Sequence, residues 1–181
     1  MLFHETGLQG AWLIEAEPAY DERGFFTRTF CVSQFAVQGL ETSFVQHSMS
    51  HSTHKHTLRG MHFQRTPHEE VKLVSCVAGA IFDVIVDVRP ESPTYLKWAS
   101  FHLTPESLHQ LYIPRGFAHG FQTLADNSIV NYLISEFYTP GAASGLRFDD
   151  PELGIEWPAD PTAMSEKDRN WPLLATPAYA S

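Results

Sequence analysis

The chain is poor in cysteine, in positive charge and in long hydrophobic runs. Its two cysteines, Cys31 and Cys76, lack the spacing of a CxxC motif or a zinc finger, so we expect free thiols in a reducing cytoplasm. Twelve Lys and Arg against 21 Asp and Glu give a formal net charge of −9, which argues against nucleic acid as a partner. No apolar run approaches the roughly 20 residues that cross a bilayer, and no signal peptide is evident. These features predict a cytoplasmic protein without a membrane span.

Helical periodicity is also scarce, whereas short alternating runs bounded by Gly and Pro are frequent. Residues 82–88 place Phe82, Val84 and Val86 on one face and the intervening acids on the other. We predict an all-β barrel with few short helices, formed by one domain over residues 1–181 with an irregular tail from about residue 160. One short helix is expected over Ser33–Gly39, capped by Ser33. The predicted strands are 10–15, 27–31, 58–64, 71–77, 82–88, 97–103, 110–113, 119–123 and 129–136.

The segment TLRGMHFQ, residues 57–64, places an arginine and a histidine three positions apart on a predicted strand. Strict alternation would direct Arg59 and His62 to opposite faces, but a bulge at Gly60 would re-aim one of them. Taken alone, the segment is more typical of an edge-strand histidine and a surface arginine than of a base beside an anion-binding guanidinium.

The segment IPRGFAHGFQ, residues 113–122, combines a tight turn with a strand that carries His119. Metal-binding cupins use a histidine in this place, together with an HxH pair followed by a glutamate. Here His54 and His56 form such a pair, but no carboxylate follows them. The metal-ligand set is therefore incomplete, and we predict no metal and no cofactor.

Four further residues are ambiguous when considered one by one. Asp83 lies within a hydrophobic strand and must be paired or face a polar cavity. Lys72 at a strand start and Asp168 in a polar stretch resemble solvated surface residues. Tyr132, on a predicted strand, is more typical of core packing than of catalysis.

Together these segments resemble the dTDP-4-dehydrorhamnose 3,5-epimerase family, whose members have the cupin or double-stranded β-helix (jelly-roll) fold. The resemblance extends from about residue 3 to 172. It rests on DERGFF (21–26), TLRGMHFQ, VKLV (71–74), IFDVIVDVR (81–89), SPT (92–94), IPRGFAHGF and SEKD (165–168). It implies an enzyme of deoxysugar biosynthesis that inverts carbon 3, carbon 5 or both of a nucleotide-linked 4-keto-6-deoxy sugar, and that forms a homodimer.

The resemblance also implies a role for each matching residue. His62 is the expected base, Asp168 its charged partner, Tyr132 the acid on the opposite face, and Lys72 the cation that stabilises the enolate. The expected substrate-binding residues are Arg23, which contacts the diphosphate from this subunit or a partner, Gln46 in the nucleotide pocket, Arg59, His119 and Asp83.

Some positions depart from the family pattern. Arg28 replaces a common Glu, His47-Ser48 a common Asp-Asn, Leu133 a common Lys, and Ser75 a common Arg. These changes leave the nucleobase open. Two other functions remain possible from the sequence: a metal-dependent cupin oxygenase or isomerase that uses His54, His56 and His119, and a cupin that binds sugar nucleotides without turnover.

Overall fold

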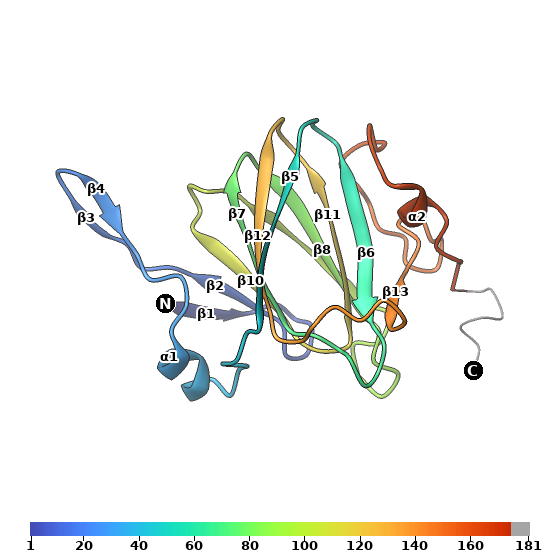
Figure 1. Cartoon of the computed structure of the whole chain (residues 1–181), viewed down its shortest axis with the longest axis horizontal. Helices are drawn as coiled ribbons and strands as arrows, with labels where there is room; N and C mark the ends of the chain where they lie inside the picture. Colours follow the sequence, from blue (N-terminus) through green and yellow to red (C-terminus); the bar gives the residue numbers. More distant parts are fainter. Residues whose placement is uncertain (175–181) are drawn as a thin grey trace.

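The computed structural model describes residues 1–174, and these form two antiparallel β-sheets that face each other (Figure 1). The prediction of an all-β fold with few short helices is confirmed. The larger sheet has the order β1 (Leu2–Glu5), β2 (Trp12–Glu15), β10 (His109–Ile113), β7 (Lys72–Ala78), β12 (Ser128–Ile134) and β5 (Gln46–Ser52). The smaller has the order β13 (Ala143–Gly145), β6 (Leu58–Gln64), β11 (Phe117–Thr123), β8 (Ile81–Asp87) and β9 (Trp98–Leu103).

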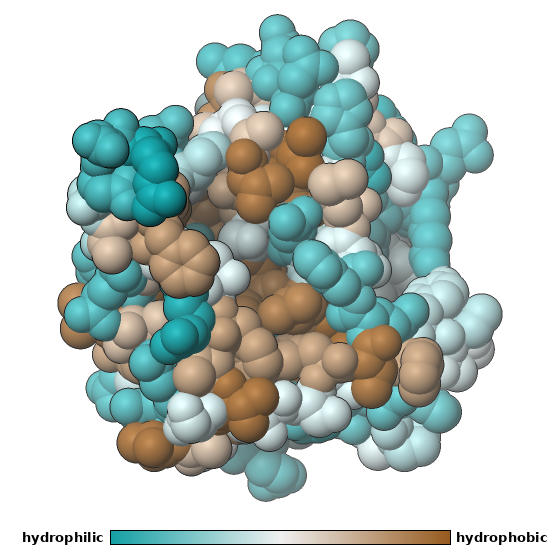
Figure 2. Space-filling model, turned by 60° about the vertical axis from the view of Figure 1, so that its left-hand side comes forward, coloured by the Kyte–Doolittle hydropathy of each residue, from teal (hydrophilic) through white to brown (hydrophobic). Residues whose placement is uncertain are grey.

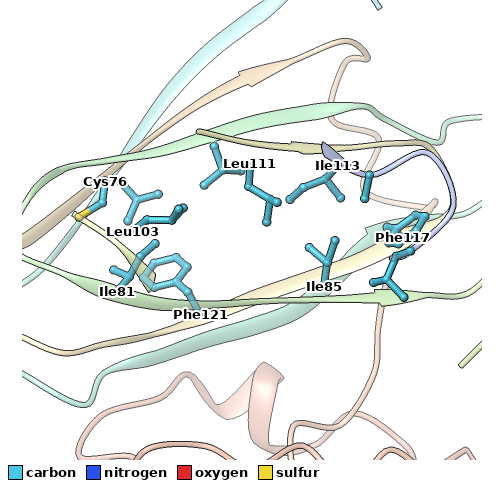
Figure 3. Close-up of a cluster of buried hydrophobic side chains, with 12 residues drawn as sticks. Cys76, Ile81, Ile85, Leu103, Leu111, Ile113, Phe117 and Phe121 are labelled. Carbon is cyan, nitrogen blue, oxygen red and sulfur yellow. The ribbon is translucent and has the colours of Figure 1, made fainter. Parts of the chain in front are cut away.

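Three hydrophobic clusters cover the faces of these sheets. The central one lies between the sheets and brings Leu111 and Ile113 of the larger against Ile85 and Phe121 of the smaller (Figure 3). A second covers the outer face of the smaller sheet with residues from beyond 145, and a third packs helix α1 (Val32–Val37) on the larger sheet. Because both faces of β8 are covered, all seven of its residues are buried.

The alternation predicted for β8 is confirmed. Phe82, Val84 and Val86 belong to the outer cluster, and Ile85 belongs to the central cluster. Asp83 shares the inner face with Ile85 because successive side chains of a strand point to opposite sides. The Asp83 carboxylate is thereby placed inside the barrel, where it pairs with His119.

Two local predictions are wrong. Residues 27–31 form no strand, and Phe30 instead packs its ring against Phe35 and Phe44, so aromatic packing decides the conformation there. The helix expected over Ser33–Gly39 spans Val32–Val37, and its N-cap is Cys31, without a side-chain cap hydrogen bond. The helix ends at Val37, two residues before the end expected at Gly39, and Gly39 follows it with φ +68°, a conformation that glycine adopts readily.

Two elements outside the barrel matter for function. A hairpin of β3 (Ala19–Asp21) and β4 (Gly24–Phe26) projects away from the barrel (Figure 1). Helix α2 (Glu166–Arg169) lies on the other side, next to β6. No helix in residues 1–174 is long and apolar enough to cross a membrane.

Candidate active site

A cavity of about 750 Å³ lies inside one end of the barrel. Its walls come from β5, β7 and β12 of the larger sheet, from β6, β11 and β13 of the smaller sheet, and from residues 163–165, 167 and 168. Seven of the nine predicted site residues line it: Gln46, Arg59, His62, Lys72, His119, Tyr132 and Asp168. Residues that are up to 122 positions apart in the chain, Gln46 and Asp168, thus meet in one chamber large enough for a small organic ligand.

A bulge in β6 explains how Arg59 and His62 both reach the cavity. His62 is paired with His119 and Arg59 with Phe121, so β6 uses one more residue than β11 over the same length. Gly60 lies inside the bulge with φ +145°, and a Cβ atom there would come within 2.5 Å of the Gly120 Cα atom. Only glycine permits this approach of the two strands, as the sequence pattern had suggested.

His62 and Asp168 form a hydrogen-bonded pair across 106 positions of sequence. His62 Nε2 lies 2.7 Å from Asp168 Oδ1, and the carboxylate side chain is only 6% exposed whereas the imidazole is 45% exposed. With Nε2 bound to the carboxylate, the other ring nitrogen is left to exchange a proton with a ligand in the cavity. This is the geometry of an oriented base.

Local structure around α2 holds Asp168 in place. The Ser165 hydroxyl caps the helix by accepting a hydrogen bond from the Asp168 N–H, and the Gly60 N–H lies 3.3 Å from Asp168 Oδ2. Burial acts to raise the pKa of Asp168, but the hydrogen bonds from His62, Gly60 and Ser165 outweigh it and lower the pKa. The carboxylate therefore stays charged beside His62 at neutral pH.

A second histidine–carboxylate pair is buried deeper. His119 Nε2 lies 2.9 and 3.1 Å from the two oxygens of Asp83, and both side chains are almost inaccessible. Complete burial raises the pKa of Asp83 against the opposing effects of His119 and Lys72. Asp83 does not line the cavity itself but supports His119, which does.

Tyr132 lies on β12, in the sheet that faces β6. Its hydroxyl lies 3.1 Å from Ser50 Oγ, and its ring packs edge-on against His119. Burial raises the pKa of Tyr132, so the phenol keeps its proton throughout the physiological range. A protonated donor thus stands on one wall of the cavity and the His62–Asp168 pair on the other.

Lys72 and Arg59 bring positive charge to the chamber. Lys72 Nζ lies 2.9 Å from Glu70 Oε1 and 3.4 Å from the His62 carbonyl oxygen. The Arg59 guanidinium donates to the Ser52 hydroxyl at 3.0 Å and to the His51 carbonyl at 2.9 Å. These contacts hold both positive charges at the cavity wall.

The other two predicted residues differ in where they lie. Gln46 lines the cavity from the start of β5 and accepts a hydrogen bond from the Tyr138 N–H at 3.1 Å. Arg23 is not part of the cavity, because it lies on the projecting β3–β4 hairpin, where it pairs with Asp21. Its side chain is 84% exposed, and no contact within residues 1–174 brings it to the site.

Sequence reasoning missed several cavity residues. Glu70 precedes Lys72 by two positions, the spacing of residues that share one face of a strand, so the period-2 pattern carried a signal. Ser50 belongs to β5, a mostly polar strand that went unpredicted and is identified by its pairing with β12 along its full length. Lys167 reaches the cavity from α2.

The metal alternative finds no support in the geometry. Within residues 1–174, no group of three or more His, Cys, Asp or Glu side chains is placed to hold a metal ion. His119 is instead engaged with Asp83, so His54, His56 and His119 do not form a ligand set.

Comparison with known proteins agrees with the geometry. The family model described as dTDP-4-dehydrorhamnose 3,5-epimerase matches residues 5–176. A protein of that name from Methanothermobacter thermautotrophicus is 48% identical, with 98% of this chain and 97% of that protein covered. The Bacillus anthracis enzyme, solved with TDP and PPi bound, has a TM-score of 0.93 at 42% identity, over 96% of this chain and 99% of that one. The Legionella pneumophila enzyme, solved with dTDP-4-keto-L-rhamnose, has a TM-score of 0.90 at 36% identity, over 96% and 92%.

Proposed function

The chain belongs to the dTDP-4-dehydrorhamnose 3,5-epimerase family, and on that premise we propose that His62 and Tyr132 are the base and acid of its epimerisation reaction. The family resemblance and the cupin-like fold predicted from the sequence motifs are confirmed. The substrate is a nucleotide-linked 4-keto-6-deoxy sugar, and one or both of the carbons beside the ketone, C3 and C5, are inverted.

The chemistry follows from the position of the ketone. A proton on a carbon next to a carbonyl is acidic because the resulting carbanion delocalises onto the oxygen as an enolate. Inversion needs a base on one face of the ring and an acid on the other. The observation that carries the proposal is the hydrogen bond of 2.7 Å between His62 on β6 and Asp168 on α2, with the partly buried, protonated Tyr132 in the sheet that faces β6.

The other cavity residues supply charge and orientation. Lys72 stabilises the negative oxygen of the enolate, since a fixed cation in a partly dehydrated cavity attracts a negative charge more strongly than a cation in water does. Asp168 stabilises the imidazolium that forms when His62 accepts the proton. Arg59 and the Asp83-supported His119 bind the substrate beside the reacting carbons, and Gln46 binds the nucleotide. The chain's own side chains perform every proton transfer in this route.

We further propose that the protein is a homodimer and that Arg23 reaches the diphosphate in the partner's cavity. The β3–β4 hairpin exposes Tyr20 at 73%, Phe25 at 52% and Phe26 at 76%, and within residues 1–174 its two strands pair only with each other. Figure 2, which brings this side of the molecule forward, shows hydrophobic residues at the surface among hydrophilic ones. Exposed aromatic residues on a projecting arm favour a protein partner.

The protein contributes to deoxysugar biosynthesis, and we place it in the cytoplasm as one domain over its length. Both cysteines are free, and burial raises the pKa of the Cys76 thiol to about 11, so it is unreactive at neutral pH. Free thiols agree with a reducing compartment.

Incubation with substrate in heavy water tests the function. We expect deuterium at C3, C5 or both, read by NMR or mass spectrometry, with dTDP-, CDP- and GDP-linked sugars each supplied. Deuterium at one carbon alone would identify a mono-epimerase. The His62→Ala variant should fold and show no exchange, whereas exchange at the wild-type rate would remove His62 from the base role. Absence of exchange in the wild type with all three nucleotides would refute the epimerase function.

A further inference from the structure

Glu70 is a cavity residue to which the mechanism above assigns no task. It lies two positions ahead of Lys72, the first residue of β7, and its side chain is only 8% exposed. One carboxylate oxygen, Oε1, lies 2.9 Å from Lys72 Nζ, whose own side chain is 12% exposed. The other, Oε2, is buried and has no hydrogen-bond partner among residues 1–174.

This arrangement is not explained by stability. Removing two charges from water costs several kcal/mol for each ion, and the attraction between them repays that cost only when the remaining hydrogen-bonding capacity is satisfied. Here one oxygen of Glu70 is left unsatisfied. A buried ion pair with an incomplete hydrogen-bond set, placed at a cavity wall, is better explained by what it does to the geometry of Lys72.

The number of hydrogen-bond donors on the Lys72 ammonium shows how Glu70 restricts the position of that ammonium. Lys72 has three N–H donors. One is directed to Glu70 Oε1 at 2.9 Å, and a second to the His62 carbonyl oxygen at 3.4 Å. Two fixed acceptors restrict a flexible side chain to one position, which leaves the third donor for a ligand oxygen in the cavity.

A direct contact between Glu70 and substrate is disfavoured by access. Oε2 has essentially no exposed surface, so an atom the size of a hydroxyl oxygen cannot touch it without displacing its neighbours. Oε1 is already occupied by Lys72. Any influence of Glu70 on the reaction therefore passes through the lysine.

We propose that Glu70 is a positioning residue that fixes the Lys72 ammonium toward the keto oxygen of the sugar. The inference rests on the proposed function, because it concerns how the enolate-stabilising cation is held. A misplacement of about 1 Å at a reacting group costs on the order of 100-fold in rate. We therefore expect Glu70→Ala to lower kcat by roughly 10- to 100-fold, with little change in KM. Glu70→Gln keeps an oxygen that accepts from Lys72 and should recover part of the loss.

A double-mutant cycle separates positioning from other roles. The variants are Glu70→Gln, Glu70→Ala, Lys72→Met and the two combinations, each assayed for epimerisation and for deuterium exchange at C3 and C5. If Glu70 acts through Lys72, its substitution lowers kcat in the wild-type background and has no further effect in the Lys72→Met background. Equal losses in both backgrounds, or no loss in either, would overturn the proposal.

Glu69→Gln is the matched control. It removes the same charge one position away, from a side chain that accepts from the Thr66 hydroxyl at 2.8 Å and lies outside the cavity lining. It should retain wild-type kcat. Circular dichroism and thermal melting identify variants that fail to fold, and Glu70→Gln, which is nearly isosteric, carries the test if Glu70→Ala does not fold. A wild type without any exchange would instead count against the proposed function.

Discussion

Replacing Asp168 by Asn tests the electrostatic role of the dyad most directly. The substitution keeps the size of the side chain but removes the negative charge that lies 2.7 Å from His62 Nε2. The proton that His62 takes from the sugar creates an imidazolium, and Asp168 stabilises that cation. If the Asn amide donates to Nε2, it also forces the imidazole proton onto the other nitrogen and blocks the base.

The size of the effect follows from the geometry. Two unit charges about 4 Å apart interact by about 4 kcal/mol at an effective dielectric constant of about 20. His62 is 45% exposed, so water screens the pair, and we take about half of that value, roughly 2 kcal/mol. Since 1.36 kcal/mol corresponds to a factor of ten, the expected loss in kcat is about 30-fold from charge alone, and larger if the tautomer changes.

The assay is turnover of the 4-keto sugar nucleotide together with deuterium exchange, for the wild type, Asp168→Asn and Glu166→Gln. Glu166 is an exposed acid on the same helix, two positions earlier and outside the cavity lining, so Glu166→Gln controls for the loss of charge. Thermal melting verifies that Asp168→Asn is folded. Turnover equal to that of the wild type in a folded Asp168→Asn protein would refute the dyad as the catalytic base.

Three other predictions address different parts of the molecule. Tyr132→Phe should form little epimer yet still exchange deuterium, because His62 can return a deuteron to the face it came from; loss of both would mean that Tyr132 is needed for abstraction. Arg23→Ala should raise KM for the nucleotide sugar with kcat and dimer size unchanged, measured by kinetics and light scattering; a monomeric wild type would contradict the shared site. Burial acts to raise the pKa of Asp87, but hydrogen bonds from Arg89, Ser92 and Thr94 lower it from 3.8 to about 2. The stabilisation that the Asp87 carboxylate provides is therefore present above pH 4 and lost as the pH falls toward 2. Asp87→Asn should melt at a lower temperature than the wild type at neutral pH, and this difference should vanish in acid. A constant difference from pH 7 to 2 would contradict this assignment.

The strands that were predicted well are those in which the alternation of apolar and polar residues matches the side chains that are buried. In β8 the alternation of apolar residues with Asp83 and Asp87 reflects two covered faces, and the structure shows both. The strand β5 was missed because HSMSHS has no apolar alternation, and its conformation depends on pairing with β12. The strand predicted over residues 27–31 was wrong for the opposite reason. The side chains there favour a strand, but no strand among the described residues lies beside them to pair with, and the ring of Phe30 packs as part of a loop.

The sequence by itself determined the fold class, the family and the chemical types of the site residues, because motifs and the alternation of apolar and polar residues involve positions close together in the chain. Only the tertiary structure decided which of those residues meet. It directed Arg59 and His62 into one cavity through the β6 bulge, placed Asp168 against His62, and set Tyr132 on the facing wall. It also revealed Glu70 beside Lys72 and removed Arg23 from its own subunit's cavity. These relations depend on distances between segments far apart in the chain, and such distances are fixed by sheet pairing and packing.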